Sequence, residues 1–131
     1  MSKAVTTIPQ TRIFDGSPEE VRNVRDFVRQ TIQGCPVADD VILLASEVAT
    51  NAIRHTASGL GGTFSVRIHV QDGWVRTEVH DLGSDTAPSV RRSGSLGESG
   101  AGLRVVDTIA DTWGFHGGQR GRVVWFEMSW Q

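Results

Sequence analysis

The sequence predicts an α+β fold, a two-layer sandwich in which a mixed, mostly antiparallel sheet is covered on one face by about three helices. Two observations carry this prediction. Apolar residues recur with helical spacing in two early segments and one late segment. Between and after these segments the spacing changes to two, the period of a strand with one buried face. The resulting order is strand, helix, helix, hairpin, loop, helix, hairpin, which is typical of the two-layer class.

The first part of the chain is expected to form a strand and two helices. Residues 1–12 are assigned to an N-terminal strand or arm. Ser17 is expected to cap the first helix, with Pro18 at its first position, because serine and proline favour these places at a helix start. A second helix is expected over residues 41–55, after a pair of aspartates that can accept its first N–H groups.

The remainder predicts two hairpins separated by a long loop and a third helix. Strands over residues 64–70 and 74–81 flank an Asp-Gly pair, which is a strong hairpin signal. Residues 83–101 are rich in Gly, Ser and Asp without periodicity, and such long connections are usually functional, so we assign them to a lid loop. The last elements are expected at residues 102–110 for the helix and at 112–116 and 122–130 for the strands.

Length and composition restrict the class of protein. A chain of 131 residues suits one domain with a sizeable core, and we expect a single domain over residues 1–131. The formal net charge of -2 argues against a general nucleic-acid binder, so no direct nucleic-acid partner is expected. The one cysteine, Cys35, cannot form an intramolecular disulfide. Without a signal-like start or a membrane-length apolar run, we expect a cytoplasmic protein with no membrane association.

A row of polar residues marks the second helix as more than a packing element. Glu47, Asn51 and His55 follow one another at i, i+4 and i+8, so they lie on nearly one face beside the apolar stripe. A helix that only fills space would not need an asparagine there, because its amide competes for backbone hydrogen bonds. The alternative is a solvated face with local i, i+4 hydrogen bonds.

Two further features have a chemical and a structural interpretation. Asp81 closes a strand and shares its face with the inward valines, so its carboxylate must be hydrogen-bonded or border a pocket. The alternative is a turn former at a strand end. Gly100 and Gly102 precede a helix whose N-terminus could seat a phosphate, although an ordinary flexible loop gives the same pattern. All three features occur in the order that one nucleotide pocket would require.

These three segments resemble the N box and the two glycine boxes of the GHKL (Bergerat-fold) ATPases. The order and size are similar to those of the bacterial anti-sigma-factor serine/threonine kinases. The resemblance covers nearly the whole domain from Ser17, and the segment EVATNAIRH at residues 47–55 is its closest match. The tail around Trp113-Gly114 and residues 124–127 looks typical of the actinobacterial branch.

The resemblance implies ATP and Mg²⁺ as cofactors and a role for each motif residue. Asn51 would coordinate Mg²⁺ and Glu47 would be the general base, roles that a carboxamide oxygen and a carboxylate can fill. Asp81 would accept the adenine amino group, and Gly83 would leave room for the base. The remaining residues implied in nucleotide binding are Gly100, Gly102, Leu103 and His55, with Arg91 and Arg92 of the lid as candidates for phosphate contacts.

Two positions depart from the family pattern. Asp85 stands where a second glycine is usual, and a carboxylate there narrows the pocket and repels phosphate if it points inward. Val123 is assigned to the position where many relatives carry a threonine that supports the adenine-binding water. The valine side chain cannot hydrogen-bond to that water. Both departures therefore favour weak nucleotide binding or its loss.

The resemblance implies an ATP-dependent protein serine/threonine kinase that is also an anti-sigma factor. Such a protein sequesters a sigma factor and phosphorylates a STAS-type anti-anti-sigma antagonist, and a homodimer is expected by similarity. The alternative is a regulatory binding module of the same fold with little or no kinase activity, which Asp85 and Val123 favour. A sensor histidine kinase is disfavoured, because the chain has no room for a dimerisation and phosphoacceptor helix pair.

Overall fold

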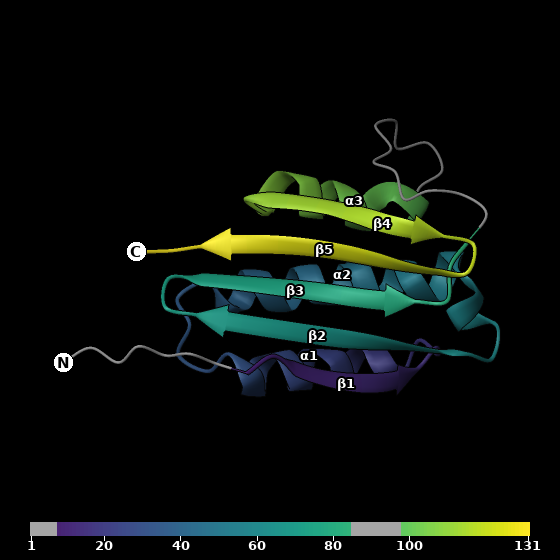
Figure 1. Cartoon of the computed structure of the whole chain (residues 1–131), viewed down its shortest axis with the longest axis horizontal. Helices are drawn as coiled ribbons and strands as arrows, with labels where there is room; N and C mark the ends of the chain where they lie inside the picture. Colours follow the sequence, from purple (N-terminus) through teal and green to yellow (C-terminus); the bar gives the residue numbers. More distant parts are fainter. Residues whose placement is uncertain (1–7, 85–97) are drawn as a thin grey trace.

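The computed structural model describes residues 8–84 and 98–131. Its five strands form one sheet in the order β1-β2-β3-β5-β4, and all four pairings are antiparallel. The three helices lie on one face of this sheet, behind the strands in the view of Figure 1. The elements in chain order are β1 (Gln10–Asp15), α1 (Glu20–Thr31), α2 (Ala38–His55), the short 3-10 helix η1 (Ala57–Gly59), β2 (Thr63–Gln71), β3 (Trp74–Asp81), α3 (Glu98–Ile109), β4 (Thr112–Gly118) and β5 (Gly121–Ser129).

The predicted fold class is confirmed, and each expected helix and strand is present. The first strand lies later than the predicted residues 1–12, at Gln10–Asp15, and residues 1–7 are outside the described part of the chain. The other differences lie mainly at helix starts. Helix α2 begins at Ala38, so the two aspartates lie in its first turn and favour the positive end of its dipole. Helix α3 begins at Glu98, so residues 98–101 of the expected lid are helical. Residues 85–97 of that lid lie outside the described part of the chain. Among the described helices, none combines the length and hydrophobicity needed to cross a membrane.

The predicted cap of the first helix is wrong. Helix α1 begins at Glu20, and its N-terminus has no side-chain cap from Ser17. Instead the Ser17 carbonyl accepts a hydrogen bond of 2.9 Å from the Glu20 N–H. Glu19 already has helical backbone angles, with φ -64 and ψ -23. The chain thus enters the helix through a turn, whereas a capping side chain needs an extended residue before the helix.

The core lies between the helix layer and the covered face of the sheet. Helix α2 contributes a stripe of buried residues with helical spacing, and its small members allow the helix to approach the strands closely. At the β1 edge, Phe14 packs between Phe27 of α1 and Phe64 of β2, with ring centroids 6.0 and 5.5 Å away. The buried residues of α2 are Val41, Ile42, Leu44, Ala45, Ser46, Val48, Ala49, Asn51 and Ala52.

The opposite face of the sheet carries a charged network, and none of the described helices covers it (Figure 1). Arg76 donates to Glu78 at 2.9 Å and to Glu127 at 2.7 Å, and its guanidinium lies over the Trp125 ring, 4.3 Å from the centroid. His80 lies 2.7 Å from the other oxygen of Glu78. Burial alone would raise the pKa of Glu78, but the hydrogen bonds from Arg76 and His80 lower this pKa below its ordinary value.

Removing the charge of Glu78 should reduce the acid sensitivity of the fold. Because its pKa is lowered in the folded protein, the carboxylate stabilises the fold above the unfolded value of about 4.3 and loses this effect as the pH falls. We expect Glu78→Gln to lower the free energy of unfolding by about 1 kcal/mol or less at pH 7 and by little at pH 3. Urea titrations at both pH values measure this. Glu19→Gln, which alters an exposed carboxylate, is the control; an equal loss at both pH values would contradict the prediction.

One buried hydroxyl of the core is unpaired. The Oγ1 of Thr77, in the middle of β3, is fully buried and has no hydrogen-bond partner among the described residues. A buried polar group without a partner costs about 1–3 kcal/mol. We therefore expect Thr77→Val, which keeps the shape, to raise the free energy of unfolding by about 1 kcal/mol. Thermal and urea unfolding test this against Thr63→Val at an exposed strand position. A lower melting temperature for Thr77→Val would show that the hydroxyl is bonded in solution.

Candidate functional site

Helix α2 delivers the predicted polar row to the edge of the core. Asn51 is buried, with 9% of its surface exposed, whereas Glu47 and His55 are half-buried one turn before and after it. Glu47 makes no hydrogen bond or ion pair with the part of the chain that the structure describes. The row is therefore not the solvated face of the alternative interpretation, because its central carboxamide lies in the interior.

The end of β3 places a second polar group beside this helix. Asp81 is buried, with 5% of its surface exposed, and its Oδ1 accepts a hydrogen bond of 2.7 Å from the Gly83 N–H. The hydroxyl of Ser58 accepts the Leu82 N–H at 2.9 Å, which ties the strand end to the short 3-10 helix after α2. The predicted inward direction of Asp81 is confirmed, and these bonds hold the strand end against the α2 terminus.

Asn51 and Asp81 meet through a residue that the sequence reasoning missed. Arg122 of β5 is buried, with 4% of its surface exposed. Its Nε donates to Oδ2 of Asp81 at 3.0 Å, and its Nη2 forms an ion pair with the same oxygen at 2.9 Å. The same Nη2 donates to Oδ1 of Asn51 at 3.1 Å. One guanidinium thus joins the two side chains predicted for the metal and for adenine.

The strand register explains why Arg122 points inward. It pairs directly with Asp81 across β3 and β5, and directly opposite residues of a pair lie on the same face. Val124, Phe126 and Met128 follow on this face at a period of two and are buried. That alternation is visible in the sequence, so it could have identified Arg122 as an inward charge.

The assignment of Val123 to a position facing the site is wrong. Val123 pairs with His80 and is half-buried on the open face of the sheet, opposite the helices. A shift of one residue along a strand moves a side chain to the other face. The inward residue at this level of β5 is therefore Arg122.

Burial and charge act on Asp81 in opposite directions. Burial raises the pKa of Asp81 above its ordinary value, because it disfavours the ionised form. The Arg122 guanidinium and the Gly83 N–H counteract this rise by stabilising the carboxylate. The guanidinium is thus the charge that compensates a carboxylate otherwise costly to bury.

The structure explains the glycine at position 83 differently from the prediction. Its φ of +92 is in the left-handed region, and a Cβ there would overlap the carbonyl oxygens of Gly118 and Gln119 in the β4–β5 turn. Its carbonyl accepts the Ala57 N–H at 2.9 Å. Gly83 therefore lets three chain segments approach one another, and space for an adenine base is not needed to explain it.

A surface cavity of about 410 Å³ opens beside this glycine. Its lining combines the end of α2 with the segment after β3 and the β4–β5 turn. The predicted residues His55 and Gly83 are both part of this lining. The lining residues are Ile53, Arg54, His55, Thr56, Ala57, Leu60, Gly83, Ser84 and Gln119.

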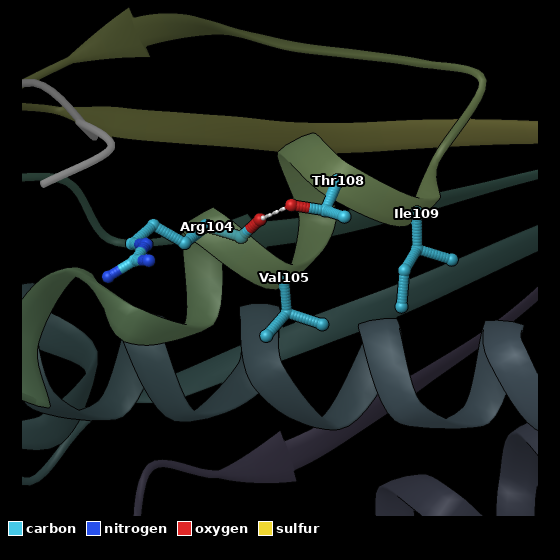
Figure 2. Close-up of a pocket in the computed structure, with 4 residues that line it drawn as sticks. All are labelled: Arg104, Val105, Thr108 and Ile109. Carbon is cyan, nitrogen blue, oxygen red and sulfur yellow. Dashed lines mark hydrogen bonds between the residues drawn. The ribbon is translucent and has the colours of Figure 1, made fainter. Parts of the chain in front are cut away.

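The remaining predicted residues lie on or before α3. Gly100 and Gly102 are in its first turns, and α3 packs alongside α2. Leu103 is buried in the hydrophobic core, with 1% of its surface exposed, so its side chain serves packing. A second cavity, of about 340 Å³, borders α3 at Arg104, Val105, Thr108 and Ile109; Figure 2 shows Val105 and Ile109 pointing toward α2. Asp85, Arg91 and Arg92 lie outside the described residues.

The oxygens present suit the expected ligands in type, but the described arrangement does not leave them free. The Asn51 carboxamide oxygen is a ligand that Mg²⁺ accepts, and the Asp81 carboxylate can accept from an amino group. Both oxygens already accept hydrogen bonds from Arg122. A divalent cation on Asn51 Oδ1 would lie beside a like charge in a buried place, which is strongly unfavourable. In this conformation the residues therefore do not fit Mg²⁺ and nucleotide at these atoms.

Replacing Gly83 should cost more stability than replacing a glycine with the same backbone angle in open space. We expect Gly83→Ala to lower the free energy of unfolding by about 1–2 kcal/mol for the left-handed angle and about 1–3 kcal/mol for the overlap with the turn. Gly34→Ala is the matched control, because Gly34 has a φ of +81 and no neighbour within 4 Å of an added Cβ. Urea unfolding of both variants measures the difference. Equal losses would show that the turn moves away without cost.

Comparison with known proteins identifies the family to which this fold belongs. The family model for the histidine kinase-like ATPase domain matches residues 14–128. Among solved structures, the crystal structure of the RsbU and RsbW domains of Rv1364c from Mycobacterium tuberculosis has 20% sequence identity and a TM-score of 0.71. The match covers 94% of this chain and 32% of that chain, so this chain spans about a third of that protein's length. No curated protein matches the chain. The family match covers most of the sequence, and the chain therefore belongs to the histidine kinase-like ATPase domain family.

Proposed function

We propose that this domain binds ATP with Mg²⁺ and transfers phosphate to a serine or threonine of an anti-anti-sigma protein. In the same proposal the domain sequesters a sigma factor and works as a homodimer in the bacterial cytoplasm. Membership of a family of ATPase domains implies ATP binding and kinase-type chemistry in general. The substrate and the partners rest on the resemblance of residues 47–55 to the anti-sigma-factor kinases.

The observation that carries the proposal is the meeting of Asn51 and Asp81 at one buried point. These residues are thirty positions apart in the sequence, and a domain that needed only packing would place apolar side chains there. Glu47 lies one turn from Asn51, half-buried and without a partner in the described chain. A carboxylate in that state can accept the proton of an attacking hydroxyl.

A second function is favoured by one specific observation. Arg122 already holds the two oxygens that nucleotide binding would use. A domain of this kind could keep its partner surfaces while binding nucleotide weakly, and would then act as a regulatory binding module. The kinase would transfer phosphate to its protein substrate, whereas the binding module would not.

Two substitutions on α2 separate metal-dependent binding from proton transfer. We expect Asn51→Ala to weaken Mg²⁺-dependent ATP binding by about 10-fold or more, since a lost charge-assisted contact is worth about 1.5–3 kcal/mol. Glu47→Ala should spare binding and slow phosphate transfer by about 100- to 10,000-fold, because it removes a general base. Calorimetry with ATP and Mg²⁺ measures the first, and transfer of radiolabelled phosphate to anti-anti-sigma proteins measures the second.

The control is Asn23→Ala, which removes an exposed carboxamide of α1 that bonds to Glu20, three residues earlier on the same helix. It should leave binding and transfer unchanged. Transfer by the wild type no faster than by Glu47→Ala, with partner binding retained, would reject the kinase and leave the binding module. Unchanged Mg²⁺-dependent affinity in Asn51→Ala would reject the metal assignment alone.

A further inference from the structure

Arg122 and Asp81 form a buried ion pair inside the helix-covered face of the sheet. Their side chains are 3% and 0% exposed. The guanidinium donates from Nε to one carboxylate oxygen and holds Nη2 2.9 Å from the same oxygen, and the other oxygen accepts from the Gly83 N–H. The ion pair is therefore geometrically good, as a buried pair must be to offset the loss of hydration.

A second hydrogen bond of this guanidinium extends the pair to helix α2. Arg122 Nη2 lies 3.1 Å from Asn51 Oδ1, so α2, β3 and β5 are tied together by one side chain. If a metal ion bound the other lone pair of this oxygen, it would lie close to the Arg122 guanidinium, and the two positive charges would repel each other. The guanidinium and Mg²⁺ thus compete for Asn51.

The same side chain also competes at Asp81. An adenine amino group approaching this carboxylate would have to enter the buried volume that the guanidinium fills. Arginine is long, planar and always charged, so it cannot lose its proton to make room and must move as a whole. Arg122 and the nucleotide with its metal ion therefore exclude each other at Asp81 Oδ2 and at Asn51 Oδ1.

We propose that Arg122 is an internal competitor of nucleotide, which occupies the site in the free protein and must withdraw before ATP and Mg²⁺ bind. This inference rests on the proposed function for the nature of the ligand. The free protein then binds nucleotide only through the fraction of molecules in which Arg122 has left Asp81 and Asn51. The apparent affinity is reduced by that fraction. A polar residue without a charge at this position lifts the competition.

The first test is calorimetry of ATP with Mg²⁺ on the wild type, Arg122→Thr and Arg122→Gln. Threonine vacates the space, and glutamine keeps a donor for Asp81 without the charge. Minor states of proteins are typically populated at about 0.1–10%, so both variants should bind about 10-fold more tightly or better. Arg76→Gln is the matched control, because it removes an arginine paired to two carboxylates on the open face of the sheet. It should leave the affinity unchanged.

A second measurement uses the wild type and does not depend on a variant that folds. The Nε–H of Arg122, which is buried and bonded to Asp81, should give a sharp, slowly exchanging side-chain signal in a nitrogen–proton correlation spectrum. This signal should shift or disappear at saturating ATP and Mg²⁺. The signal is assigned in the wild type by through-bond correlation to the Arg122 backbone. An unchanged signal in the saturated wild type would overturn the proposal.

The possible results separate this inference from the proposed function. Tighter binding by folded variants supports the competition. Binding by the variants alone also supports it, and rejects the wild-type kinase in favour of the binding module. Equal or weaker binding by folded variants, with wild-type binding intact, overturns the competition and leaves the proposed function standing. Absence of binding in all three proteins rejects both, and circular dichroism verifies that the variants are folded.

Discussion

An antiparallel sheet with a helix layer on only one face imposes a strict alternation on each strand. Every second residue of β3 and β5 lies beneath the helices, and the residues between them face outward. On the covered side the alternation supplies the core, apart from Thr77 and one charged pair, Asp81 at the end of β3 and Arg122 at the start of β5. On the open side it supplies a charged network with a tryptophan in its middle. The site exists because the alternation continues one step past the apolar residues and brings Asp81 and Arg122 under α2.

Helix α2 converts this strand-end pair into a three-element junction. Its small apolar residues allow a close approach to the sheet, so a carboxamide on the same helix reaches the guanidinium. Removing one partner of a buried ion pair typically costs about 3–5 kcal/mol, because the other charge is left uncompensated. The Arg122 contact therefore contributes to the fold as well as occupying a place expected for a ligand. Natural domains are only marginally stable, so breaking such a contact costs a large part of the folding free energy. A ligand that replaces Arg122 must offset this cost with its binding free energy.

Much of the architecture was predictable because it follows from periodicity. Each helix, each hairpin and the inward direction of Asp81 were expected from apolar spacing and turn signals, and the structure has them. The helix starts were less predictable. Ser17 has the right identity for a cap, but the local turn at Pro18 brings Glu20 onto its carbonyl, and backbone angles of this kind are not encoded by one residue type. Gly83 was singled out for its room for adenine, whereas the structure explains it by the close turn of a hairpin some thirty-five residues later in the chain.

The sequence by itself determined the fold class, the polar row of α2 and the inward carboxylate of β3, because helical and strand periods are local properties of the chain. The inward direction of Arg122 was also predictable, although it was overlooked, because Arg122, Val124 and Phe126 follow one another at a period of two. Only the tertiary structure decided which groups meet. The register of β3 against β5 places Arg122 opposite Asp81, which is 41 positions earlier in the chain. The packing of α2 adds Asn51, which is 71 positions before Arg122. Such distances depend on how whole elements pack, and no local pattern specifies them.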